Sequence, residues 1–78
     1  MNKISIEFFG MLVELTGQKS IVLENIGDTE NLKNQINDLF PALKKQTYML
    51  ALNNKLITNN TSIQHNSNVA CMPPFAGG

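Results

Sequence analysis

The stretch DTENLKNQINDLFP, residues 28–41, contains the pattern that decides the fold. Its apolar residues recur at the spacing of one helix face, and they are Leu32, Ile36, Leu39 and Phe40. Asp28 or Thr29 can cap the start, and Pro41 ends the helix because the residue before a proline disfavours helical backbone. The solvent side would then hold Lys33, Asn34, Asn37 and Asp38. The stretch therefore predicts one amphipathic helix that needs an apolar surface to cover.

Short strand patterns lie on both sides of this helix. They cover residues 3–9, 20–24, 48–52, 56–57 and 68–72. In the first, Ile4, Ile6 and Phe8 alternate with polar residues, as in a strand with one buried face. We expect the second strand to pair antiparallel with the first. The run 48–52 is apolar on both faces, which predicts a central strand.

Glycines and polar runs indicate the connections between these elements. Gly10 ends the first strand, and residues 11–17 fit a short helix whose last residue, Gly17, takes the left-handed C′ conformation. Residues 58–68 predict an exposed loop with Ile63 as its apolar anchor. One helix on one face of a mixed sheet is the simplest way to bury these patterns. The expected fold is α+β, a β-grasp (ubiquitin-like) domain over residues 1–78.

Composition excludes several classes of protein. The chain has 78 residues, 42% hydrophobic and 15% charged, with a formal net charge of zero. It is too apolar for a disordered tail and lacks the basic runs that bind nucleic acid. No apolar run approaches the ~20 residues that cross a bilayer, so we expect no membrane partner and a cytoplasmic location. The lone Cys71 excludes an internal disulfide.

No conventional catalytic set is evident from the spacing of reactive residues. His65 falls in the polar loop and Cys71 in an apolar strand, so we expect a solvated histidine and a buried cysteine. A nucleophile and base pair needs both groups within hydrogen-bond reach. The single histidine, single cysteine and dispersed acids predict no metal site, and no glycine-rich phosphate loop is present.

The carboxyl end is the most informative segment for function. The chain finishes Met72, Pro73, Pro74, Phe75, Ala76, Gly77, Gly78. The two prolines predict an extended stem for a flexible tail of residues 73–78, and the final residues are almost bare backbone. A terminal carboxylate reacts only after activation, most simply as an acyl-adenylate in another enzyme's site. A slim tail suits that entry, whereas the alternative is a frayed terminus.

Three segments resemble the small subunit of molybdopterin synthase, a ubiquitin-like sulfur carrier. They are residues 6–17, with Leu-x-Glu-Leu-x-Gly at their end, the Leu-Asn end of 51–53, and 73–78, which fit Pro-Pro-x-x-Gly-Gly. The resemblance implies that Gly78 is the reactive residue, adenylated and then thiocarboxylated. It implies a partner-binding tail made of Met72, Pro73, Pro74, Phe75, Ala76 and Gly77, with Phe75 as an anchor in the partner's channel.

The resemblance also implies the partners. An adenylating enzyme like those that activate ubiquitin would use ATP and Mg²⁺, and a sulfur donor protein would supply sulfur. The large synthase subunit, in a heterotetramer, would hold the cyclic pyranopterin monophosphate that accepts it. No cofactor would be bound by this chain itself.

Two positions depart from the family pattern, and other functions stay open. Val13 replaces a basic residue, and residues 65–68 replace an acidic turn, so the docking surface is expected to be more apolar. The alternatives are a sulfur carrier for thiamine thiazole or another sulfur metabolite, and a ubiquitin-like conjugation or interaction module.

Overall fold

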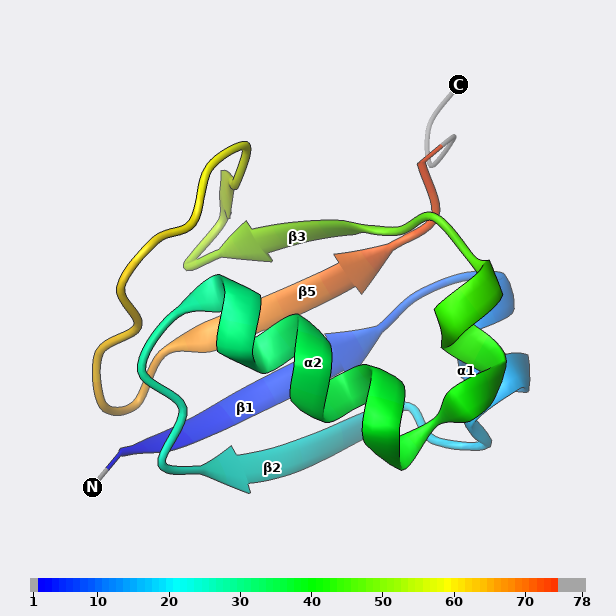
Figure 1. Ribbon diagram of the computed structural model, residues 1–78, viewed down its shortest axis with the longest axis horizontal. Coiled ribbons are helices and arrows are strands. Elements are labelled where there is room, and N and C mark those ends of the chain that lie inside the picture. Colours follow the sequence, from blue (N-terminus) through cyan, green and yellow to red (C-terminus); the bar gives the residue numbers. More distant parts are fainter. Residues whose placement is uncertain (1, 75–78) are drawn as a thin grey trace.

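The computed structural model describes residues 2–74, which form one five-stranded sheet with α2 lying across one face (Figure 1). The elements are β1 (Lys3–Phe8), α1 (Met11–Thr16), β2 (Ser20–Glu24), α2 (Thr29–Leu39), the 3₁₀ helix η1 (Pro41–Lys45), β3 (Met49–Leu52), β4 (Lys55–Leu56) and β5 (Asn68–Met72). The strand order is β2-β1-β5-β3-β4. β1 runs parallel to β5 and the other pairs are antiparallel. The predicted β-grasp fold is confirmed.

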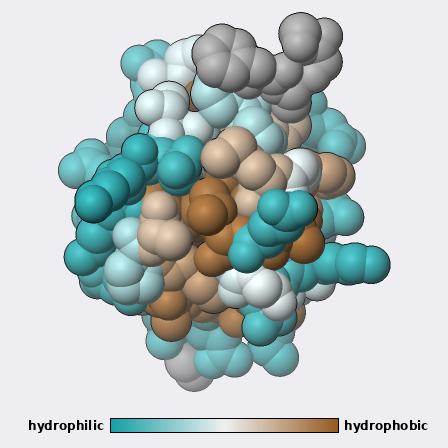
Figure 2. All heavy atoms as spheres, turned by 90° about the vertical axis from the view of Figure 1, so that its right-hand side faces the viewer, coloured by the Kyte–Doolittle hydropathy of each residue, from teal (hydrophilic) through white to brown (hydrophobic). Residues whose placement is uncertain are grey.

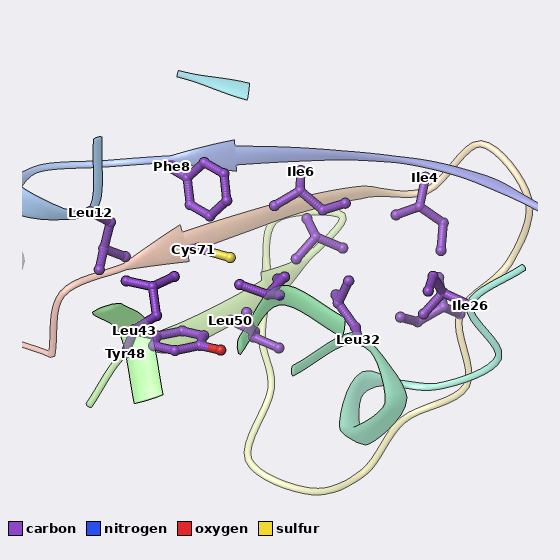
Figure 3. Close-up of a cluster of buried hydrophobic side chains, with 13 residues drawn as sticks. Ile4, Ile6, Phe8, Leu12, Ile26, Leu32, Leu43, Tyr48, Leu50 and Cys71 are labelled. Carbon is purple, nitrogen blue, oxygen red and sulfur yellow. The ribbon is translucent and has the colours of Figure 1, made fainter. Parts of the chain in front are cut away.

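Strand alternation builds the covered face of the sheet. In β1, Ile4, Ile6 and Phe8 are at most 3% exposed, whereas the three residues between and before them are exposed. Figure 3 shows these side chains pointing toward the helix layer, with Leu32 of α2 and Leu50 of β3 in the same cluster. The predicted antiparallel pairing of the second strand with the first is also confirmed.

Helix α2 begins where the sequence predicted and differs in its last turn. The Asp28 side chain accepts a hydrogen bond from the Asn31 N–H at 2.8 Å, which makes Asp28 the cap. Leu39 was expected in the core and is 52% exposed. The helix ends there, and Phe40 leaves helical geometry (φ −129°) to place its ring edge-on to Phe8, with 5.7 Å between ring centroids. At the end of α2, Phe40 therefore packs against the core and Leu39 does not.

The prediction that Asn37 lies on the solvent side of α2 was wrong, whereas the run 48–52 contains β3, which pairs with β5 and β4 as expected of a central strand. Asn37 is half-buried, and its Oδ1 accepts a hydrogen bond from the Tyr48 hydroxyl at 2.9 Å. In β3, Leu50 is buried, but Met49 and Ala51 lie on the other face and are only half-buried. The face of β3 that packs on the helix layer is therefore buried, whereas the other face is open although its residues are apolar.

The connections follow the sequence pattern closely. Gly17 ends α1 at φ 71°, and its N–H donates to the Val13 carbonyl at 2.8 Å. Ile63 anchors the loop before β5 and is 6% exposed. None of the helices formed by residues 2–74 has both the length and the apolar content needed to cross a membrane.

Candidate functional site

The site is built around the point where the chain leaves β5. β5 lies between β1 and β3, so its end is held from both sides. The Phe9 N–H donates to the Cys71 carbonyl at 3.0 Å, which extends the parallel pairing one residue past β1. These bonds place the base of the tail at one end of the sheet, where Figure 1 shows the chain leaving the domain.

Gly10 fixes the position of Pro73 at this exit. Gly10 has φ +58°, and a Cβ on it would lie 3.0 Å from the Pro73 Cγ. A side chain here would therefore meet both a strained backbone and the proline ring. The residue that ends β1 is also the surface on which the first residue after β5 packs.

The structure describes three of the predicted tail residues. Met72, Pro73 and Pro74 are half-buried, and Pro74 lies in a turn. The extended stem predicted for the two prolines is wrong at Pro74, because the φ that proline imposes suits a turn as well as an extended chain. The predicted residues Phe75, Ala76, Gly77 and Gly78 lie outside the described residues.

The open face of the sheet presents an apolar strip that ends at this exit. We define the apolar strip as Met49, Ala51, Ala70 and Met72. The register places Ala51 opposite Ala70 and Met49 opposite Met72, and strand alternation turns all four away from the core. Beside the strip is a hollow of about 330 Å³, lined in part by Glu7, Phe9 and the two alanines. The hollow exists because alanines lie between longer side chains.

A second apolar surface lies at the same end of the molecule. Figure 2 looks onto this end, where α1 and η1 lie, and shows apolar side chains gathered there. Two exposed apolar residues lie in α1 and at the end of α2. Met11, the first residue of α1, is 47% exposed, and Leu39, the last of α2, is 52% exposed. The exit of the tail is therefore bordered by apolar surface on two sides.

The reactive side chains of the described residues are not arranged for catalysis. Cys71 is fully buried, and burial raises the pKa of its thiol to about 12 although Lys33 opposes the shift. A protonated thiol is a poor nucleophile. His65 is exposed, and its Nδ1 accepts a hydrogen bond from the Lys3 N–H at 3.1 Å. Both residues take the places predicted for them, and they are not in contact.

Within residues 2–74, no three side chains among His, Cys, Asp and Glu gather closely enough to hold an ion. Of the predicted site residues, the structure describes Met72, Pro73 and Pro74, and it places them beside the apolar border.

Sequence reasoning missed the strip and the Gly10 contact. Ala51 and Ala70 are small residues in separate strands, and only the register shows that they are neighbours. Gly10 was predicted to end the first strand. Its contact with Pro73, more than sixty residues away, is visible only in the folded chain. The signal available was the apolar residue at every outward position of the 48–52 run.

A model of the ThiS family matches residues 6–78. Among solved structures, the putative molybdopterin converting factor subunit 1 of Pyrococcus furiosus gives a TM-score of 0.89 at 15% identity, over 95% of this chain and 99% of that one. SAMP1 of Haloferax volcanii gives a TM-score of 0.83 at 17% identity, over 99% of this chain and 100% of that one. A chain from the protein-protein complex of subunits 1 and 2 of molybdopterin-converting factor from Helicobacter pylori gives a TM-score of 0.72 at 24% identity. The match covers 97% of this chain and 99% of that one. At these identities the structural likeness shows the fold.

Proposed function

Because this chain belongs to the ThiS family, we propose that it is a sulfur carrier whose reactive group is the carboxylate of Gly78. The proposal rests on one observation above the others. The chain ends in Gly77-Gly78 only six residues after β5, within a domain whose last strand is held on both sides. A rigid domain with a short, slim carboxyl end can present that end to another enzyme's active site.

The inert cysteine supports this assignment. A sulfur-transfer protein could hold sulfur on a thiol, but Cys71 is 0% exposed and its raised pKa keeps the thiol protonated at neutral pH. Carrying sulfur at the carboxyl terminus needs no side chain of this kind. The terminal carboxylate would attack the α-phosphate of ATP and release pyrophosphate. Hydrosulfide would then displace AMP and leave a thiocarboxylate, whereas a persulfide donor would displace AMP to give an acyl disulfide that a second thiol cleaves to the thiocarboxylate.

The finer assignment is the small subunit of molybdopterin synthase. It is supported by the Pro73-Pro74-x-x-Gly-Gly end, which the related thiazole carriers usually lack. In this role the tail residues Phe75, Ala76 and Gly77 enter the large subunit, and Gly78 delivers sulfur to the cyclic pyranopterin monophosphate. The catalytic base and the pterin pocket belong to the large subunit, and ATP and Mg²⁺ to the adenylating enzyme.

The apolar strip is the surface we assign to docking beside the tail. The apolar strip ends at Met72, the residue before Pro73, so a partner that takes the tail would also meet this face. Methionine adapts its shape to more than one surface. A carrier has to fit an activating enzyme and an acceptor in turn, which suits a small apolar surface with flexible edges.

The intact mass of the full chain tests the sulfur-carrier function. The chain is co-expressed with the adenylating enzyme and sulfur donor of its own source. We expect a gain equal to the replacement of one oxygen by sulfur. A variant lacking Gly78, and a control with one alanine added after Gly78, should both show no gain while their circular dichroism stays unchanged. A persistent carboxylate in the full chain would contradict the proposal.

A second step distinguishes the pathways. The thiocarboxylated chain is mixed with a molybdopterin synthase large subunit and the cyclic pyranopterin monophosphate, and dithiolene formation is measured. Sulfur transfer to a thiazole synthase instead would overturn the molybdopterin assignment and keep the carrier. Isopeptide bonds to lysines of other proteins would identify a conjugated modifier.

A further inference from the structure

Within residues 2–74, no strand pairs with the outer edge of β2. β2 lies at the end of the strand order, and Figure 1 shows it as the outermost strand on its side of the sheet. The Phe8 N–H donates to the Lys19 carbonyl, and the Asn25 N–H donates to the Asn2 carbonyl. Backbone groups alternate sides along an antiparallel strand. The N–H and C=O groups of Ser20, Val22 and Glu24 therefore point away from β1, and we call these groups the β2 edge.

The side chains of this edge are unusually apolar for an exposed strand. Val22 is 59% exposed. Ile21 and Leu23 face the helix layer, but both are only half-buried and no residue of β2 is buried. Natural sheets protect their edges with central charges, prolines or bulges. Here the charged residues Lys19 and Glu24 lie only at the two ends, so the middle of the edge can accept another strand.

We propose that β2 pairs antiparallel with β2 of a second copy of this chain, with Val22 opposite Val22 of the second copy. In this register Ser20 lies opposite Glu24 of the second copy, so all three outward residues use both backbone groups. A shift of one residue would place the two helix layers on opposite faces of the joined sheet. A shift of two would leave outward groups unpaired at both ends.

The side chains of the two copies are complementary in this register. On the covered face, Ile21 lies opposite Leu23 of the second copy. Because Ile6 pairs with Ile21 and Ile4 with Leu23 within each chain, each pair of copies gains two continuous apolar rows. On the open face Val22 meets Val22, and the Glu24 carboxylate has Lys3 on its other side in its own chain. No like charges lie opposite each other.

Charge and geometry both permit the association. The formal net charge is zero, so two copies do not repel each other at long range. β5 is the third strand from this edge, so the contact lies away from the exit of the tail. The paired edges are much smaller than the ~1,200–2,000 Å² buried in stable interfaces, and we therefore expect a weak dimer that depends on concentration.

Sedimentation velocity of the full chain tests this pairing from micromolar to millimolar concentration. The wild type should shift from monomer to dimer. Val22→Lys and Val22→Glu each place like charges opposite each other, and each should weaken dimerisation at least about tenfold. An equimolar mixture of the two should restore it, because Lys then faces Glu. Gln35→Lys, an exposed position on α2, is the control for added charge and should dimerise as the wild type does.

Amide hydrogen exchange of the wild type gives a second readout that needs no variant. The Val22 N–H should become protected as concentration rises, while the N–H of Gln35 should not change. A monomer at millimolar concentration would overturn the proposal and leave the edge for a strand of another protein. Dimerisation of Val22→Lys equal to the wild type, or a mixture that stays monomeric, would also overturn it.

Discussion

The two faces of the sheet are made from the same strands and differ in what they can do. In β5, Val69 and Cys71 face the helix layer and are at most 2% exposed. Ala70 and Met72, their immediate neighbours, face outward and are half-buried. The covered face uses branched and aromatic residues that fill space, whereas the open face uses alanine and methionine. Alternation along one strand thus separates stability from contact with other molecules.

This separation would let a small domain stay folded while it bound different partners. Hydrophobic burial is the main source of stability, and here it is concentrated on one side of the sheet. Changes on the open face should then alter recognition with little effect on folding. Changes on the covered face should do the reverse.

The largest effect on stability is expected for Ile6→Ala on the covered face. Ile6 is 0% exposed, and truncation of such a residue removes buried area and leaves a cavity. We expect the free energy of unfolding to fall by about 2–5 kcal/mol in urea denaturation. Glu7→Ala, the next residue and on the open face, is the matched control and should change it by less than about 0.5 kcal/mol. Equal losses for the two variants would remove the distinction between the faces.

A smaller effect is expected at high pH, again from the covered side. Burial raises the pKa of Cys71 to about 12, and burial together with the nearby Cys71 charge raises that of Tyr48 to about 12. In the unfolded chain these groups lose their protons at about pH 9 and 10. The folded state then binds more protons, so stability is complete below about pH 9 and falls as pH rises toward 12.

Tyr48→Phe isolates the tyrosine contribution to this pH dependence. The variant loses the hydrogen bond to Asn37 Oδ1, which costs about 1 kcal/mol at pH 7. Its unfolding free energy should nevertheless fall less steeply than that of the wild type between pH 9 and 12. Chemical denaturation at several pH values measures both the loss of stability at pH 7 and the steepness of the fall between pH 9 and 12. Parallel curves for the two proteins would mean that Tyr48 ionises as easily in the folded state as in the unfolded one.

Much of the fold could be predicted from local patterns. The Asp28 cap, the apolar period of α2 and the alternation of β1 each involve residues only a few positions apart, so the sequence displays each of them directly. The exposure of Leu39 and the short helix η1 could not be predicted in this way. They depend on Phe40 leaving the helix to pack on Phe8, which is a contact between segments distant in sequence.

The candidate site likewise has one part that local sequence predicts and another part that depends on contacts between distant segments. Met72, Pro73 and Pro74 were predicted because the carboxyl-terminal motif is continuous in sequence. The apolar strip depends on the register between β3 and β5, and the packing of Pro73 on Gly10 depends on the parallel pairing of β1 with β5. The apolar outward positions of 48–52 indicate an apolar face, but the sequence does not show which strands pair, because alanine and glycine occur in many other settings.

The smallest effect on stability, and a large one on function, is expected for Ala70→Lys on the open face. Ala70 is paired with Glu7 of β1, so the new lysine gains an opposite charge and unfolding free energy should change by less than about 0.5 kcal/mol. The same lysine would fill the hollow and bring a charge to the apolar strip. We therefore expect slower thiocarboxylation by the adenylating enzyme, measured as the rate of mass gain on the intact chain. Gln35→Lys adds the same charge on α2 and should react at the wild-type rate. If Ala70→Lys is thiocarboxylated as fast as that control, the adenylating enzyme does not contact the apolar strip. The open face would then be left to bind another partner.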